Sequence, residues 1–177
     1  MTITKQSTLL LLIIATLFSC NKIDELTEFD VTDGFSTTMS VSIPDESTEA
    51  QTFSETSTID ILSNQDIQEN LNLIQDININ SLTYEITNFT GAQNTTITNA
   101  SLSFGDLGIN VDEINPQTAD EAGTVYTITD TDLLRNIASI LKSSGSITAT
   151  LEGTVSSTPI NFDIAIKLDL TATIDVL

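Results

Sequence analysis

The 177-residue chain contains no histidine and no tryptophan, one cysteine, and only five lysine and arginine residues. Without histidine it lacks the commonest general base and metal ligand, and a single cysteine can form neither an internal disulfide nor a cysteine-rich zinc site. The 25 aspartate and glutamate residues give a formal net charge of −20. Because nucleic acids are polyanions, this charge argues against a nucleic-acid partner.

The N-terminal residues have the pattern of an export signal. A short polar start carries one cation, Lys5, and is followed by a continuous apolar run over 9–14. A permanent membrane-spanning helix needs about 20 apolar residues, so this run is too short to be one. Its length and position fit the hydrophobic region of a signal peptide, which we assign to residues 1–19.

The next residues, Leu17-Phe18-Ser19-Cys20, place a leucine three positions before a cysteine and a small residue directly before it. This motif resembles the lipobox of bacterial lipoproteins. The resemblance implies cleavage before Cys20 and acylation of that residue, which would use the only thiol of the chain. Asn21 stands where an aspartate would retain a Gram-negative lipoprotein at the inner membrane, so the resemblance implies the outer membrane.

Residues 20–28 are predicted to form the lipidated N-terminus and a polar tether. At about 3.3 Å per residue, the stretch after the cysteine reaches roughly 26 Å, well beyond a Debye length of about 8 Å. We therefore expect the acidic domain to sit clear of the lipid head groups. Lys22-Ile23-Asp24-Glu25 loosely resembles signals for export to the cell surface, and a solvated tether explains it equally well. The periplasmic and surface-exposed faces both stay open.

Residues 29–177 are predicted to form a single all-β domain. The chain contains 29 threonine and 23 isoleucine residues, which favour strands, and apolar residues recur with a period of two. Nine successive even positions from Ile160 to Val176 are apolar. An extended segment of this length would reach about 56 Å, so we expect it to bend or to be shared between two sheets. We predict an antiparallel β-sandwich of about seven to nine strands.

Two helices are expected within this domain. A short one begins at Ser63, and an amphipathic one contains Leu133, Ile137 and Leu141, with Gly145 just beyond its end. Between them, residues 105–123 are expected to be mainly loop.

Three local irregularities are predicted within or between the strands. Gly34 indicates a bend or bulge, Pro44-Asp45-Glu46-Ser47 a turn, and the change of apolar parity near Asn80-Ser81 a bulge.

The acidic residues offer the chain's main chemistry. Oxygen ligands for Ca2+ could come from Asp112, Glu113, Asn115, Asp120 and Glu121, or from the smaller group of Asp30 and Asp33. No EF-hand spacing is present, and a diffuse counterion cloud is the simpler interpretation, so no metal site is assigned. The expected strand positions of Tyr84 and Tyr126 suggest core residues and argue against a sugar-stacking platform.

Ser139-Ile140-Leu141-Lys142 has the S-x-x-K spacing of penicillin-recognising serine enzymes. The companion S-D-N and K-T-G motifs are missing, and two of the four residues belong to an apolar helical stripe. We interpret the match as a coincidence.

These observations favour a lipid-anchored, noncatalytic cell-envelope protein that needs no cofactor. It would act as an interaction or structural module of the outer membrane, with a protein partner in the envelope. The alternative is a small hydrolase that uses a pair of carboxylates on envelope or extracellular glycans. The mature domain loosely resembles small β-sandwich lipoproteins, which implies location and architecture and transfers no site residue.

Overall fold

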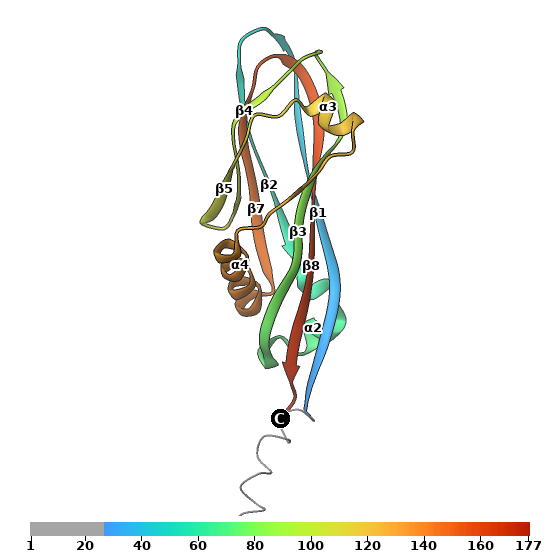
Figure 1. Cartoon of the computed structure of the whole chain (residues 1–177), viewed down its shortest axis with the longest axis vertical. Helices are drawn as coiled ribbons and strands as arrows, with labels where there is room; N and C mark the ends of the chain where they lie inside the picture. The colour runs from blue at the N-terminus through green and yellow to red at the C-terminus, as the bar shows by residue number, and fades with distance from the viewer. Residues whose placement is uncertain (1–26) are drawn as a thin grey trace, which may run out of the picture.

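Two four-stranded antiparallel sheets face each other in the computed structural model, which describes residues 27–177 (Figure 1). The first sheet has the order β1-β8-β3-β6 and the second the order β2-β7-β4-β5. Their bounds are β1 Glu28–Ser47, β8 Thr158–Asp175, β3 Ile74–Gly91 and β6 Val125–Thr127 in the first sheet, and β2 Gln51–Asp60, β7 Ser146–Val155, β4 Ile97–Phe104 and β5 Leu107–Val111 in the second. The predicted all-β sandwich of seven to nine strands is confirmed.

Strand β8 lies at the centre of the first sheet, between β1 and β3. Its even-numbered residues face the core, and the side chains of Phe162, Ile166 and Leu168 are fully buried. The strand stays in one sheet along its 18 residues, so of the two expected alternatives, a bend or sharing between two sheets, the second is wrong. It can do so because its neighbours β1 and β3, with 20 and 18 residues, are at least as long and supply hydrogen-bond partners along most of its length.

The two sheets meet in a closely packed core. Phe53 of the second sheet contacts Phe162 of the first edge-to-face, with ring centroids 5.9 Å apart. The void between the sheets measures only ≈ 20 Å³, too small for an organic ligand. Along one side of the sandwich the edge strands β1 and β2 lie together, and the Thr37 and Ser57 hydroxyls are hydrogen bonded. On the other side β5 and β6 are the edges, and this open side carries the surface hollows described below.

The first sheet extends past the second at one end. Because Thr37 meets Ser57, the first residues of β1 run beyond the point where β2 ends at Asp60. This overhang is covered by the short helices η3 (Ile61–Ser63), α2 (Gln65–Glu69) and η4 (Leu71–Leu73). Ile61 and Ile67 from this segment are fully buried. The start of β1 and the C-terminus lie at this same end (Figure 1).

The amphipathic helix is confirmed as α4, Thr131–Ser144, which packs against β3 and β7. The Asp130 side chain accepts hydrogen bonds from the backbone N–H groups of Asp132 and Leu133, each at 3.0 Å. Gly145 ends the helix with φ +73°, a left-handed conformation that glycine adopts without strain. No helix within residues 27–177 is long and apolar enough to span a membrane.

The region predicted as loop, 105–123, contains both β5 and a third helix, α3 (Pro116–Glu121). Asn115 caps α3 by accepting a hydrogen bond from the Thr118 N–H at 2.9 Å, and Pro116 occupies the first turn, where a missing N–H costs nothing. The earlier short helix is capped by Asn64 rather than by Ser63. The Asn64 Oδ1 accepts hydrogen bonds from the backbone N–H groups of Asp66 and Ile67.

Strand details differ from the sequence prediction in two places. No turn forms at Pro44–Ser47, because β1 continues to Ser47 with a shift of register after Ile43. Gly34 pairs with Asp169 without a bulge. A Cβ atom at Gly34 would lie 2.8 Å from the Asp169 Oδ1, so the glycine leaves room for that side chain. The bulge near Asn80-Ser81 is confirmed by the register shift between Ile79 and Ser81.

Candidate functional site

The predicted acylation site lies outside the described residues. Leu17, Phe18, Ser19 and Cys20 all precede Thr27, where the description begins. Lipid attachment at Cys20 therefore stays a prediction. Within residues 27–177, two hollows on the open side of the sandwich are the candidate sites.

The first hollow, here called the tyrosine pocket, lies between the edge strands β5 and β6. Its volume is ≈ 370 Å³. The wall is formed by Tyr84 and Tyr126, and the rim is polar, with the exposed side chains of Asn110, Asp112 and Glu113. The segment after β5 and helix α3 close the pocket from the side, so it is built from both sheets and from the region that was predicted as loop.

The two tyrosines stack face to face. Their ring centroids are 4.9 Å apart and the planes differ by 10°. They are opposite each other in the β3–β6 pairing, which holds the rings in register. Tyr84 is the inner ring, with 9% of its surface exposed, whereas Tyr126 is half-buried and faces the pocket. Burial raises the pKa of Tyr84 to about 12, with smaller contributions from the neighbouring Tyr126 and Asp112.

This arrangement corrects one expectation from the sequence. Tyr84 is a core residue as expected, but Tyr126 lines a surface pocket beside two carboxylates. The sequence did not show this because Val125 and Ile128 have opposite parity, which leaves the inward face of so short a strand undefined. In the structure Val125 points outward, with 55% exposure, and Tyr126 points inward.

The acidic residues considered for calcium are not brought together. The Asp120 Oδ2 accepts a hydrogen bond from the Phe89 N–H at 2.9 Å, and the Glu121 Oε1 accepts from the Gln117 side chain at 2.8 Å. Asp112 and Glu113 lie apart from these two residues and line the tyrosine pocket together with Asn115. No group of three or more histidine, cysteine, aspartate or glutamate residues that could hold a metal ion occurs within 27–177.

The smaller acidic pair is also divided between separate contacts. The Asp30 Oδ1 accepts from the Thr173 hydroxyl at 2.7 Å. The Asp33 carboxylate accepts from the Asn64 side chain and from the Gly34 N–H, both at 2.8 Å, and these hydrogen bonds lower the pKa of Asp33. Asp33 thereby ties β1 to the helical segment that covers the overhang.

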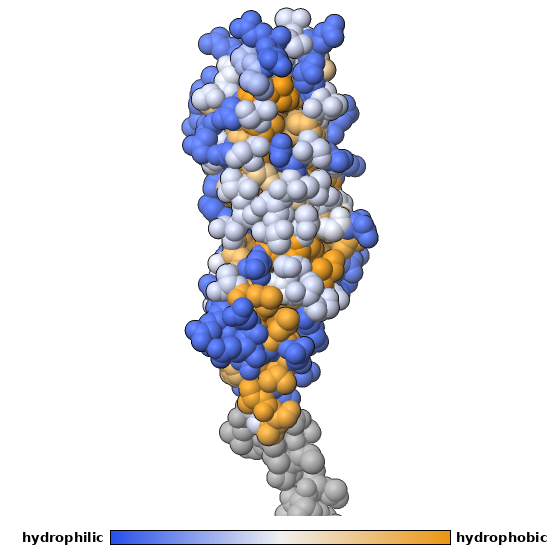
Figure 2. All heavy atoms as spheres, turned by 180° about the vertical axis from the view of Figure 1, so that it is seen from behind, coloured by the Kyte–Doolittle hydropathy of each residue, from blue (hydrophilic) through white to orange (hydrophobic). Residues whose placement is uncertain are grey.

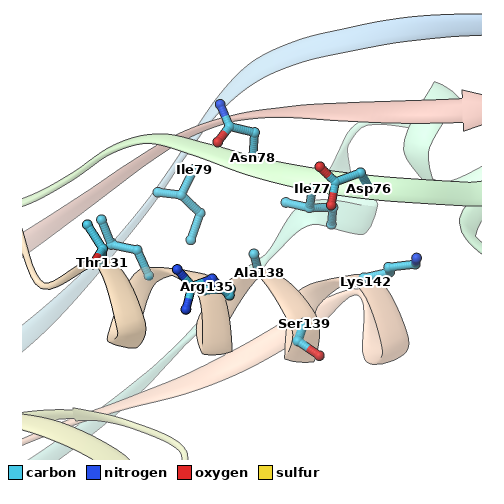
Figure 3. A pocket seen from close by; sticks show the side chains of 10 residues that line it. Asp76, Ile77, Asn78, Ile79, Thr131, Arg135, Ala138, Ser139 and Lys142 are labelled. Atoms are coloured by element: carbon cyan, nitrogen blue, oxygen red, sulfur yellow. The ribbon is translucent and has the colours of Figure 1, made fainter.

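The second hollow is a groove of ≈ 610 Å³ between α4 and the edge of β3 (Figure 3). Ile77 and Ile79 of the strand and Ala138 of the helix lie along its floor, and the polar side chains stand at its borders. Two of the three cationic residues of 27–177, Arg135 and Lys142, line it. Both have partners, since Arg135 forms a 2.7 Å ion pair with Asp132 and the Lys142 ammonium donates to the Gln75 carbonyl.

The S-x-x-K segment lies on this groove. Ser139 and Lys142 are both exposed on α4, and Figure 3 shows them pointing in different directions. The lysine ammonium is bonded to a backbone carbonyl of β3, so it is not arranged to take a proton from the serine hydroxyl. This geometry supports interpreting the motif as a coincidence.

Comparison with known proteins does not identify a family for this chain. No protein-family model matches the chain, and no curated protein is significantly similar to it. Among solved structures, a chain from Desmodium yellow mottle tymovirus is similar over 84% of this chain and 84% of its own length, with 11% sequence identity and a TM-score of 0.33. A likeness this remote carries no argument about function.

Proposed function

We propose that this protein is a lipid-anchored, noncatalytic interaction module of the bacterial outer membrane. The observation that carries the proposal is the order of features at the N-terminus: one cation, a short apolar run, and Leu17-Phe18-Ser19-Cys20. Two or three acyl chains on Cys20 would anchor the protein stably, because each buried methylene contributes about 0.8 kcal/mol.

The described domain supports a binding role in the tyrosine pocket. The exposed part of the Tyr126 ring offers an apolar surface, and Asp112 and Glu113 beside it offer hydrogen-bond acceptors and negative charge. Tyrosine is effective in binding surfaces because it provides a large contact area with few rotatable bonds. The partner would present a cationic or hydrogen-bond-donating group. We propose that this partner is a protein of the cell envelope.

A glycan hydrolase is the second candidate, and the two carboxylates next to an aromatic ring in one pocket are the observation in its favour. Release of new reducing ends from purified envelope glycan by the wild-type protein, but not by Glu113→Gln or Asp112→Asn, would establish this activity. Equal release by all three proteins would rule out a role for these two carboxylates in hydrolysis, and no release by the wild-type protein would leave binding as the function.

The anchor is tested by changing Cys20→Ala. Metabolic labelling with a fatty-acid analogue should mark the wild-type protein and not the variant, and the variant should leave the membrane fraction. Ser19→Ala is the matched control, since it keeps a small residue before the cysteine and should preserve labelling. Fatty-acid incorporation into the Cys20→Ala protein would overturn the assignment.

The binding role is tested by affinity capture from envelope fractions with tagged mature protein. A partner that uses the tyrosine pocket should be recovered by the wild-type protein and by Tyr126→Phe, and lost with Tyr126→Ala. Failure of the wild-type protein to retain any stable partner would count against the interaction module.

A further inference from the structure

Exposed large hydrophobic residues gather at one end of the domain. Five such residues occur within 27–177, and four of them lie where β1 begins and β8 ends, whereas the fifth, Val125, lies near the tyrosine pocket. The four form what is here called the apolar end: Phe29, 40% exposed, Leu73, 39%, Val176, 51%, and Leu177, 81%. Figure 2 shows hydrophobic residues at this lower end of the domain.

The pairing of the strands places these residues side by side. Phe29 of β1 and Ile74 of β3 both pair with Ile174 of β8, from opposite sides. Leu73 directly precedes Ile74, and Val176 donates its N–H to the Thr27 carbonyl at 3.2 Å. Three separate parts of the chain therefore contribute to one surface.

The overhang of the first sheet explains why this surface is bare. Phe29 has the same odd-numbered phase as Phe35 and Met39, which are buried between the sheets. At Phe29 the second sheet has already ended, and the helical segment 61–73 does not cover the last residues. Large apolar side chains left in water forgo the favourable free energy of their burial. A concentration of them at one end therefore favours contact with an apolar partner.

We infer that the apolar end rests in the interface of the lipid bilayer to which the protein is anchored. The inference rests on the proposed acylation of Cys20. Six residues lie between Cys20 and Thr27, and the seven residue steps can span at most about 25 Å, so the anchor keeps this end of the domain close to the lipid. The high local concentration created by the tether allows even a weak apolar contact to form.

The charges around the apolar end indicate which lipid surface suits it. Glu28 and Asp30, on either side of Phe29, are both exposed. Asp175 lies beside them, and its carboxylate accepts hydrogen bonds from the Thr27 hydroxyl at 3.0 Å and from the Leu177 N–H at 3.1 Å. This rim of carboxylates would be repelled by anionic head groups and tolerated by zwitterionic ones. The expected surface is therefore a zwitterionic bilayer.

The contact would change the expected role of the tether. The sequence suggested that residues 20–28 hold an acidic domain away from the head groups. With Phe29 and Leu73 at the interface, the domain would instead stand on the membrane with its long axis directed outward. The tyrosine pocket, about halfway along β3 and β8, would then be held at a defined height above the lipid.

The test uses the absence of tryptophan from the chain. Phe29→Trp and Phe89→Trp each introduce a single fluorophore by the same substitution at opposite ends of the domain, since Phe89 lies near the far end of β3. The acylated variants are placed in phosphatidylcholine vesicles with bromine atoms in the acyl chains near the interface. We expect emission from Phe29→Trp to fall at least about twofold relative to unbrominated vesicles, and emission from Phe89→Trp to stay unchanged.

Failure of the proposed anchor and failure of the inference can be told apart. If mass spectrometry shows no acyl chains on Cys20, the proposed anchor fails. If the protein is acylated and bound to vesicles but Phe29→Trp is not quenched more than Phe89→Trp, the anchor stands and the inference is overturned. A second variant, Leu73→Trp, guards against a local disturbance of β1 and should be quenched like Phe29→Trp.

Discussion

The ionisation of Tyr84 gives a quantitative test of the structure. This tyrosine is 9% exposed in the core below the tyrosine pocket, and burial raises its pKa to about 12. An unperturbed tyrosine ionises near pH 10. The chain has only two tyrosines and no tryptophan, so the absorbance of tyrosinate near 295 nm can be followed with little interference. Changing Tyr126→Phe keeps the stacked ring and leaves Tyr84 as the single chromophore.

The pKa shift also predicts how stability depends on pH. Because the folded-state pKa of Tyr84 lies above the unfolded value, the contribution of the neutral phenol is fully present below pH 10. It is lost as the pH rises from 10 to about 12. A shift of about two units corresponds to roughly 2–3 kcal/mol of unfolding free energy over that range. In Tyr84→Phe this loss should be absent.

The assay records absorbance and far-ultraviolet circular dichroism of the Tyr126→Phe protein at the same pH values. We expect the native protein to ionise well above pH 10 and the urea-unfolded protein to ionise at about pH 10. If the protein unfolds during the titration, a rapid pH jump measures ionisation before unfolding. Ionisation of Tyr84 near pH 10 while the circular dichroism is still native would refute the burial of this residue.

Two further predictions concern stability. Ile166→Asp, at a fully buried position of β8, should lower the unfolding free energy by about 4 kcal/mol or more because it buries a carboxylate. The control Val176→Asp, at an exposed position of the same parity, should change the unfolding free energy by less than about 1 kcal/mol. Equal melting temperatures for the wild type and Ile166→Asp would show that Ile166 is not in the core. Hydrogen bonds from Ser40 at 2.6 Å and Asn88 at 2.8 Å lower the pKa of Asp163, so its stabilisation is present above the unfolded pKa and is lost as the pH falls through the lower folded value. The melting temperature should therefore fall more between pH 5 and pH 2 for the wild type than for Asp163→Asn, and parallel curves would contradict this role.

The sequence predicted best where every local signal indicated the same structure. Alternation along β8 identified its buried face because a central strand between two long neighbours has its apolar side covered at every even position up to Ile174. Helix α4 was equally clear, since its apolar stripe, its acidic start and Gly145 all indicated the same boundaries. In both elements, local pattern and tertiary packing agree.

Prediction failed where the outcome depended on a distant segment. Gly34 suggests a bulge by itself, but the structure uses its missing side chain to make room for Asp169 on the neighbouring strand. Helix α3 has a recognisable start in Asn115-Pro116, yet the surrounding glycines and acids favoured a loop. The tyrosine pocket needed both the pairing of Tyr84 with Tyr126 and the position of the segment after β5, and neither is visible from local spacing.

Phe29 shows what strand periodicity leaves undetermined. Periodicity assigns a residue to one face of a strand, and it placed Phe29 on the same face as Phe35 and Met39. Whether that face is covered depends on where the opposing layer ends, which is set by the length of β2 and by the path of residues 61–73. A long sheet opposite a shorter one leaves an uncovered apolar margin at its end, and here the margin lies at the end from which the chain leads back to Cys20. If the margin were only an imperfection of packing, it would have no reason to coincide with the end nearest the proposed acylation site, and this coincidence is the argument for a membrane contact.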